Sequence, residues 1–156
     1  MFKVFKEMHF CYAHRLLGYP GKCAQLHGHN SVVQVEFSGT QTDDLGILID
    51  FDQIRSLVND YLDKELDHKT ILWEKDPLVG VLQNAGEKVF CMRNQPSAEN
   101  MAQLIFEFVK EKKLPVSSVK VWETPTSCAE YNPLDPPYQR ERQMNPSPDK
   151  GRIGGV

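Results

Sequence analysis

The sequence predicts an α+β domain in which an antiparallel sheet packs against two helices on one face. Two segments, 2–14 and 30–39, alternate apolar and polar residues with the period of two that is typical of half-buried β-strands. Two later segments, which follow Asp50 and Pro96, repeat apolar residues at the spacing of amphipathic helices. Strands and helices in this mixed order favour the α+β class.

The first two strands are expected to pair, because His14 ends the first and His29 leads into the second. Residues 42–46, Thr-Asp-Asp-Leu-Gly, are typical of a turn after the second strand. We therefore expect a hairpin in which 47–51 returns as a further short strand.

Asp50 is expected to cap the first helix, since Gln53 follows at the third position in a pattern like a capping box. The helix has one apolar face, formed by Ile54, Leu57, Val58, Tyr61, Leu62 and Leu66. This helix places Asp67 and His68 just beyond its end.

The stretch from Trp73 to Pro96 is less regular, and only 88–92 within it predicts a short strand. Ser97 then caps the second helix, with Glu99 in the first turn at the positive end of the helix dipole. Its buried stripe comprises Ala98, Met101, Ala102, Ile105, Phe106 and Val109. A strand over 116–123 and a short aromatic piece around Tyr131 follow.

Residues 1–131 are expected to form one folded domain, and 132–156 a proline-rich C-terminal tail. Proline recurs at five positions of this tail among polar residues, which cannot build a core. We expect the tail to be extended or disordered, or to lie along a partner subunit.

Composition excludes several classes of function. The net charge of −3 and the lack of a dense Lys/Arg run argue against nucleic-acid binding. The N-terminus has no continuous apolar run, so we expect neither a signal peptide nor a membrane span. The 4 scattered cysteines are too few for a disulfide scaffold and suit a reducing, cytoplasmic compartment.

Three histidines predict a metal site. His27 and His29 flank one glycine, so on a strand both imidazoles point to the same face. His14 ends the neighbouring strand and supplies a third imidazole. Three imidazoles with an open fourth position are typical of catalytic rather than structural zinc.

Cys23 lies four residues before His27 and has two interpretations. It is either a further zinc ligand or a free thiol beside a cationic centre. In the second case the cation lowers the thiol pKa and makes a thiolate available as base or nucleophile. No Cys-x-x-Cys pair supports a zinc finger.

Six segments in order resemble the 6-pyruvoyltetrahydropterin synthase and 6-carboxytetrahydropterin synthase family, whose architecture is the T-fold. The matching segments are Phe10–Leu16, Cys23–Asn30, Gly46–Phe51, Leu66–Lys69, Pro96–Asn100 and Val121–Thr124. The resemblance implies that His14, His27 and His29 hold Zn²⁺ and that Cys23 is the general base. It also implies that Asp67 and His68 form a proton-relay dyad and that Glu123 anchors a pterin ring.

Each of these residues also has a plainer interpretation when it is taken alone. Asp67 fits a cap or a partner of Lys69, and His68 fits a surface histidine at a helix end. Glu123 fits a solvent-facing charge at the end of a strand. Arg15, Lys22 and Arg93 are candidates for a triphosphate group, but their spacing does not select among them.

The substrate that the resemblance implies is a pterin triphosphate, 7,8-dihydroneopterin triphosphate. The Cys-x-x-x-His-Gly-His interval, from Cys23 to His29, resembles the branch that forms 6-carboxy-5,6,7,8-tetrahydropterin, acetaldehyde and triphosphate on the way to queuosine. The alternatives are the 6-pyruvoyltetrahydropterin synthase reaction, a dihydroneopterin side-chain-cleaving variant, a non-catalytic zinc-dependent pterin-binding protein and a structural zinc domain.

The resemblance also implies self-association. A small sheet with helices on one face has open edges, and closing several sheets into an oligomeric barrel removes them. The expected assembly is a homo-hexamer, a dimer of trimers, in which Asp67 and His68 serve the zinc of a neighbouring chain.

Overall fold

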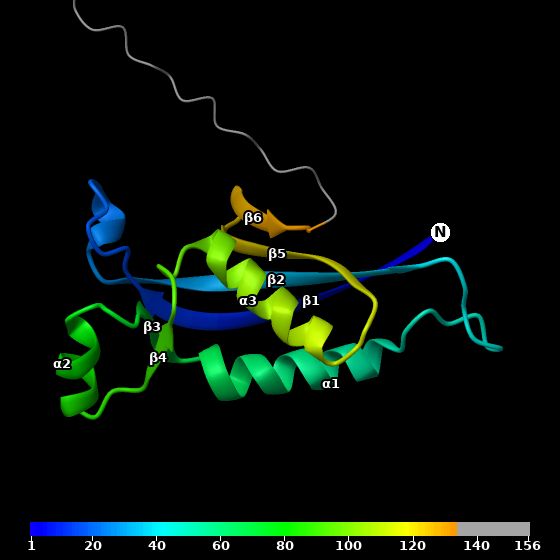
Figure 1. Ribbon diagram of the computed structural model, residues 1–156, viewed down its shortest axis with the longest axis horizontal. Helices are drawn as coiled ribbons and strands as arrows, with labels where there is room; N and C mark the ends of the chain where they lie inside the picture. The colour runs from blue at the N-terminus through cyan, green and yellow to red at the C-terminus, as the bar shows by residue number, and fades with distance from the viewer. Residues whose placement is uncertain (134–156) are drawn as a thin grey trace, which may run out of the picture.

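A computed structural model describes residues 1–133, which form one six-stranded sheet with three helices (Figure 1). The strands are β1 (Phe2–His14), β2 (His27–Gly39), β3 (Lys69–Trp73), β4 (Val89–Met92), β5 (Val116–Thr124) and β6 (Ser127–Tyr131). The helices are α1 (Phe51–Tyr61), which continues as the π-helical turn η2 (Leu62–Leu66), α2 (Leu78–Asn84) and α3 (Ala98–Glu111). A short 3₁₀ turn, η1 (Lys22–Ala24), lies between β1 and β2.

The long hairpin of β1 and β2 is the centre of the sheet, whose strand order is β4-β3-β1-β2-β5-β6. Alternate residues of β1, β2 and β5 are buried, and they pack against the apolar stripes of α1 and α3. Figure 1 shows α3 crossing in front of β1, β2 and β5, with α1 alongside it. The predicted pairing of the first two strands is confirmed, and it starts three residues earlier than expected, at His27.

The predicted return strand over 47–51 is wrong. Asp43 holds this stretch in a turn, because its carboxylate accepts hydrogen bonds from the backbone N–H groups of Leu45 and Ile47, at 2.9 Å each. Gly46 adopts a φ of +80°, which suits glycine. Asp50 then begins α1 by accepting from the N–H of Asp52, so the prediction of this cap is confirmed.

The stretch after Trp73 is more ordered than predicted, and the sheet is mixed rather than wholly antiparallel. β3 pairs in parallel with both β1 and β4, and α2 connects β3 to β4. The sequence signal is weak here, since α2 has seven residues and none of them is buried. Asp76 organises this connection, because its carboxylate accepts from the N–H of Leu78 at 2.8 Å.

The second predicted helix cap is confirmed at Ser97, which begins α3 by accepting from the N–H of Asn100. All four cysteines are free thiols. None of the helices among residues 1–133 is long and apolar enough to cross a membrane. The predicted tail lies outside the described residues, apart from positions 132 and 133.

Candidate metal centre and active site

Three imidazoles meet at the end of the β1–β2 hairpin. His14 lies opposite His27 in the strand register, and Tyr12 lies opposite His29. Because these positions alternate, all four rings project from the same face of the sheet. One nitrogen from each of the three histidines lies within 4.8 Å of the others, so the group can hold a metal ion.

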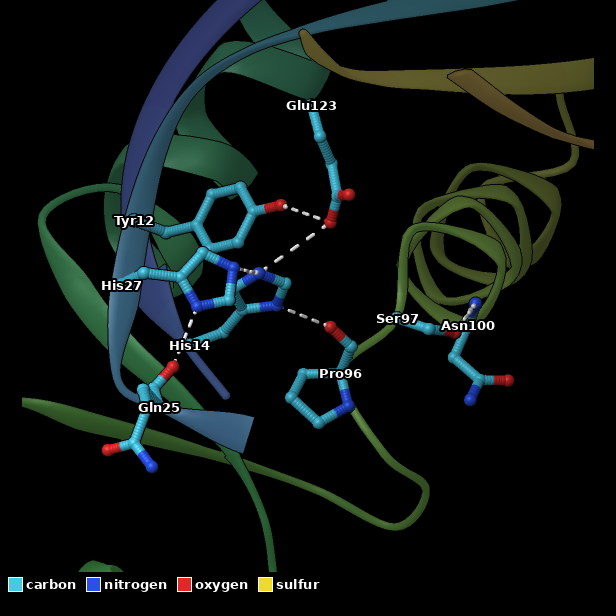
Figure 2. Close-up of polar contacts among 8 residues, drawn as sticks. All are labelled: Tyr12, His14, Gln25, His27, Pro96, Ser97, Asn100 and Glu123. Atoms are coloured by element: carbon cyan, nitrogen blue, oxygen red, sulfur yellow. Dashed lines mark hydrogen bonds and ion pairs between the residues drawn. The ribbon is translucent and has the colours of Figure 1, made fainter. Parts of the chain in front are cut away.

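Hydrogen bonds to backbone carbonyls orient two of the imidazoles (Figure 2). The Nδ1 of His14 lies 2.7 Å from the carbonyl of Pro96, and the Nδ1 of His27 lies 2.8 Å from the carbonyl of Gln25. A carbonyl only accepts, so each Nδ1 carries the proton and each Nε2 is left with a lone pair. This is the arrangement in which metal-binding histidines are usually held.

The two Nε2 atoms of His14 and His27 are 3.1 Å apart. Two lone pairs at this distance repel one another unless a proton or a cation lies between them. Imidazole nitrogens at two tetrahedral positions around zinc are about 3.3 Å apart, given Zn–N bonds of about 2.0–2.1 Å. The spacing therefore fits a shared cation.

His29 supports the same interpretation, because its Nε2 is buried and makes no hydrogen bond. A buried polar atom without a partner is costly, and ligation to an ion removes that cost. Burial also lowers the pKa of His14, despite the opposite effect of the Pro96 carbonyl. His14 is therefore held in the neutral form that metal binding requires.

Glu123 lies beside the three imidazoles, at the end of β5. Its Oε1 is 3.7 Å from His14 Nε2 and accepts a hydrogen bond from the Tyr12 hydroxyl at 3.3 Å (Figure 2). Burial raises the pKa of Tyr12, and the Glu123 carboxylate adds to this effect. Tyr12 therefore remains a neutral donor that orients the carboxylate.

Asp67 and His68 form a hydrogen-bonded pair at the turn between η2 and β3. One Asp67 oxygen accepts from the backbone N–H of Cys11 at 2.7 Å, and the other bonds His68 Nδ1. Burial opposes ionisation of Asp67, but the hydrogen bonds from Cys11 and His68 outweigh it and lower its pKa. His68 has a φ of 53°, and its side chain is 79% exposed, so the outer part of the ring is open to a partner.

The side chains of Cys11, Ala13 and Asn30 alternate with the cluster residues along the hairpin and therefore project from its second face. A cavity of about 440 Å³ is lined by these three residues and His68, and also by Tyr12 and by His29 of the cluster. The Cys11 thiol lies 2.9 Å from the Asn30 side chain on this second face. The fold thus brings His14, His27, His29 and Glu123 together, and one cavity joins His68 of the dyad to His29 of the cluster.

Cys23 lies in η1, in the loop that joins two of the cluster histidines, and its thiol is half-buried. Its carbonyl accepts from the N–H of Leu16 at 2.8 Å, which ties it to the residues that follow β1. Arg15, a candidate for the triphosphate group, instead forms a two-pronged ion pair with Asp76. Lys69 donates to the carbonyl of Lys64 rather than pairing with Asp67.

Sequence reasoning missed three partners of the site. Tyr12 had a usable signal, since it lies two residues before His14 and therefore shares its face. The carbonyls of Gln25 and Pro96 had none, because any residue supplies a carbonyl. Their roles depend on the backbone path, which only the fold provides.

Comparison with known proteins identifies relatives of this chain. The family model described as 6-pyruvoyl tetrahydropterin synthase matches residues 3–133. A Haemophilus influenzae protein named 6-carboxy-5,6,7,8-tetrahydropterin synthase is 37% identical over 143 residues, which cover 84% of this chain and 99% of the relative. A Rickettsia bellii protein of the same name is 32% identical over 137 residues, or 83% of this chain and 99% of the relative.

Solved structures share the fold. An uncharacterized protein from Wolinella succinogenes superposes with a TM-score of 0.75 at 23% identity, covering 85% of this chain and 98% of its own. The 6-pyruvoyl tetrahydropterin synthase of Caenorhabditis elegans superposes with a TM-score of 0.62 at 22% identity, covering 84% of this chain and 94% of its own.

The curled sheet, the flanking helices and the hairpin that carries three imidazoles define a T-fold protein with a candidate metal centre. Within that class, the chain belongs to the 6-pyruvoyl tetrahydropterin synthase family.

Proposed function

We propose that this protein is a zinc-dependent lyase that converts 7,8-dihydroneopterin triphosphate, with consumption of one water, to 6-carboxy-5,6,7,8-tetrahydropterin, releasing acetaldehyde and triphosphate. The observation that carries the proposal is the cluster of three imidazoles with unprotonated or unpartnered Nε2 atoms beside the Glu123 carboxylate. The names of relatives at 32% and 37% identity over most of the chain support this reaction.

His14, His27 and His29 would hold the zinc ion. Bound there, zinc would supply Lewis-acid chemistry to the hydroxyl groups of the substrate side chain. Three imidazoles suit zinc, but they also suit copper, iron and nickel, so the choice of zinc belongs to the proposal.

Glu123 would bind the pterin ring. Its carboxylate offers two acceptor oxygens to the donors along the amino-pyrimidine edge. The Tyr12 hydroxyl donates to Oε1 and leaves Oε2 free of that bond, so Tyr12 would fix the direction in which the carboxylate points. The ring would then lie next to the imidazole cluster, because His14 is 3.7 Å from the same oxygen.

Cys23 would act as the general base that removes a proton from the substrate side chain. A thiolate is favoured near a bound cation. Asp67 and His68 would relay protons, since Asp67 holds Nδ1 of the imidazole and leaves the other ring nitrogen to exchange a proton.

The dyad would complete the metal site of a neighbouring subunit, which the exposed outer part of the His68 ring would allow. Exposed apolar side chains at the far end of the hairpin favour self-association, and they include Phe2, Phe5, Leu45 and Phe51. We propose a homo-hexamer built as a dimer of trimers, with residues 1–131 as the assembling domain and 132–156 as a separate tail.

Product analysis tests the reaction. The zinc-loaded protein is incubated with 7,8-dihydroneopterin triphosphate, without a reductase, and the products are identified by mass spectrometry. We expect 6-carboxy-5,6,7,8-tetrahydropterin and acetaldehyde. Formation of 6-pyruvoyltetrahydropterin would instead establish the alternative reaction, which the name of the matching family favours.

A second candidate is a pterin-binding protein without turnover. The Cys23→Ala variant separates this candidate from an enzyme, because a binding protein needs no base. We expect loss of turnover with unchanged pterin affinity, measured by isothermal titration against the product. Activity that survives the substitution would contradict the assignment of Cys23 as the base.

A further inference from the structure

The side-chain amide of Gln95 connects two segments of the site that are far apart in the sequence. Its Oε1 accepts from the backbone N–H of Leu17 at 3.1 Å, and its Nε2 donates to the carbonyl of Leu17 at 2.9 Å. Both backbone groups of one loop residue are therefore bound by a single side chain, as a neighbouring strand would bind them.

The Gln95 end of this connection is rigid. Its own carbonyl accepts from the Asn100 side chain and from the N–H of Ser97, both at 2.8 Å. Pro96, the next residue, supplies the carbonyl that holds the imidazole of His14. The start of α3 thus fixes Gln95 with respect to the metal centre.

The Leu17 end belongs to the loop that carries Cys23. The neighbouring residue Leu16 donates its N–H to the carbonyl of Cys23, so Leu17 and Cys23 are linked through one backbone hydrogen bond. The loop returns to the sheet at His27. Gln95 therefore bridges the support of one imidazole and the segment that bears the thiol.

We propose that Gln95 is a positioning residue that holds the Cys23 loop at a fixed place beside the metal centre. The inference rests on the proposed function, in which Cys23 is the base. Without the Gln95 amide, Leu17 loses two hydrogen bonds and the loop can move away from the imidazoles. The Arg15–Asp76 ion pair still anchors the beginning of the loop, so the fold persists.

Two variants and one control test the proposal. Gln95→Met keeps the length of the side chain and removes both hydrogen bonds, and Gln95→Ala removes the side chain. The control is Gln103→Ala on α3, a half-buried glutamine whose amide donates to Glu107 of the same helix.

The first measurement is the rate at which iodoacetamide alkylates Cys23, followed by peptide mass mapping. The alkylation is carried out at a pH of about 9.5, where a thiol of ordinary pKa is ionised. We expect both Gln95 variants to react about tenfold faster than wild type, and the control to react at the wild-type rate. Cys91 and Cys128, both exposed, serve as internal references.

The second measurement determines kcat and KM by steady-state kinetics, together with the amount of zinc bound to each variant. A misplaced base should lower kcat by roughly 10–100-fold, because a displacement of about 1 Å has effects of that size. KM and zinc content should stay near the wild-type values. If both variants lost zinc, Gln95 would act on His14, and the proposal would be wrong.

Unchanged alkylation and unchanged kcat, with only a lower melting temperature, would show a merely structural contact and would also overturn the proposal. If Gln95→Met behaved like wild type, packing rather than hydrogen bonding would hold the Cys23 loop in place, and the proposal would be wrong. Absence of turnover in the wild-type protein would refute the proposed function, while the alkylation rates would still decide the role of Gln95.

Discussion

The unpartnered Nε2 of His29 makes a direct test of the metal centre possible at the scale of one residue. We expect His29→Ala to weaken metal binding by more than the roughly 10–100-fold loss that follows removal of an outer-shell partner. The affinity is measured by competition with a chelating dye. The control is His9→Ala, at an exposed histidine of the neighbouring strand β1, and this variant should bind metal like wild type. Equal affinities for the two variants would contradict the three-imidazole site.

The residue types and the alternation of the two strands were sufficient to predict this cluster. The sequence predicted that the two strands pair, but the register that sets His14 opposite His27 comes from the structure. The family resemblance implied that Glu123 anchors a pterin ring, and in the structure its Oε1 lies 3.7 Å from His14 Nε2. The role of Gln95 was not predictable, because it depends on which loop residue lies opposite its amide.

At the scale of single elements, the β1–β2 hairpin depends on the small size of Gly28. A Cβ at this position would come within 2.9 Å of the backbone oxygen of Tyr12. We expect Gly28→Ala to lower the free energy of unfolding by about 1–3 kcal/mol, as overpacking does. It should also weaken metal binding, since the glycine separates two of the proposed ligands, His27 and His29.

The matched control for this prediction is Gly80→Ala in α2, where nothing lies within 4 Å of the added Cβ. This change should stabilise the protein by about 0.5–1 kcal/mol, because alanine favours helix more than glycine does. Denaturant unfolding measures both variants. If the Gly28→Ala protein were as stable as wild type, β1 and β2 would be able to move apart and admit the added methyl group without lowering the free energy of unfolding.

The connection through α2 depends on the buried carboxylate of Asp76. Its hydrogen bond with Arg15 lowers its pKa, and the Leu78 N–H adds to this effect against the opposing effect of burial. Because the pKa is depressed on folding, the stabilisation is present above the usual value of about 3.9 and is lost as the pH falls through the lower, folded value.

We therefore expect Asp76→Asn to lower the free energy of unfolding by about 2–3 kcal/mol at pH 7, with the difference shrinking below a pH of about 4. Asp52→Asn is the control, because Asp52 is 83% exposed and pairs with Arg55 at 3.4 Å. That variant should stay within about 0.5 kcal/mol of wild type. Chemical unfolding at a series of pH values gives the free energy of unfolding of each variant and of wild type. A difference between Asp76→Asn and wild type that did not depend on pH would contradict the ion-pair explanation.

Long periodic elements were predictable, and one short strand, predicted over 88–92, is confirmed as β4 (Val89–Met92). The β1 strand and the caps at Asp50 and Ser97 follow from local patterns that the sequence displays. The missed elements, β3 and α2, have five and seven residues. They are stabilised by parallel pairing with distant strands and by the Arg15–Asp76 pair, which local patterns do not reveal.

At the scale of the whole molecule, the proposed sharing of the dyad with a neighbouring subunit predicts complementation between subunits. His14→Ala and Asp67→Asn should each be inactive alone. Mixed oligomers, formed by co-expression, should regain about one quarter of wild-type activity, because some sites combine an intact cluster with an intact dyad from another chain. Mixed oligomers that stay inactive would mean that each site is built within one chain.

The pairing of His14 with His27 has a consequence for how the chain reaches its native state. A slip of one residue along β1 and β2 would turn one histidine to the opposite surface of the sheet, and the three nitrogens would no longer converge. An ion that requires all three therefore binds only molecules whose strands are correctly aligned, and by mass action it draws misaligned molecules toward that alignment. A cell that supplies the metal during synthesis would thus favour correctly folded chains over their mispaired competitors.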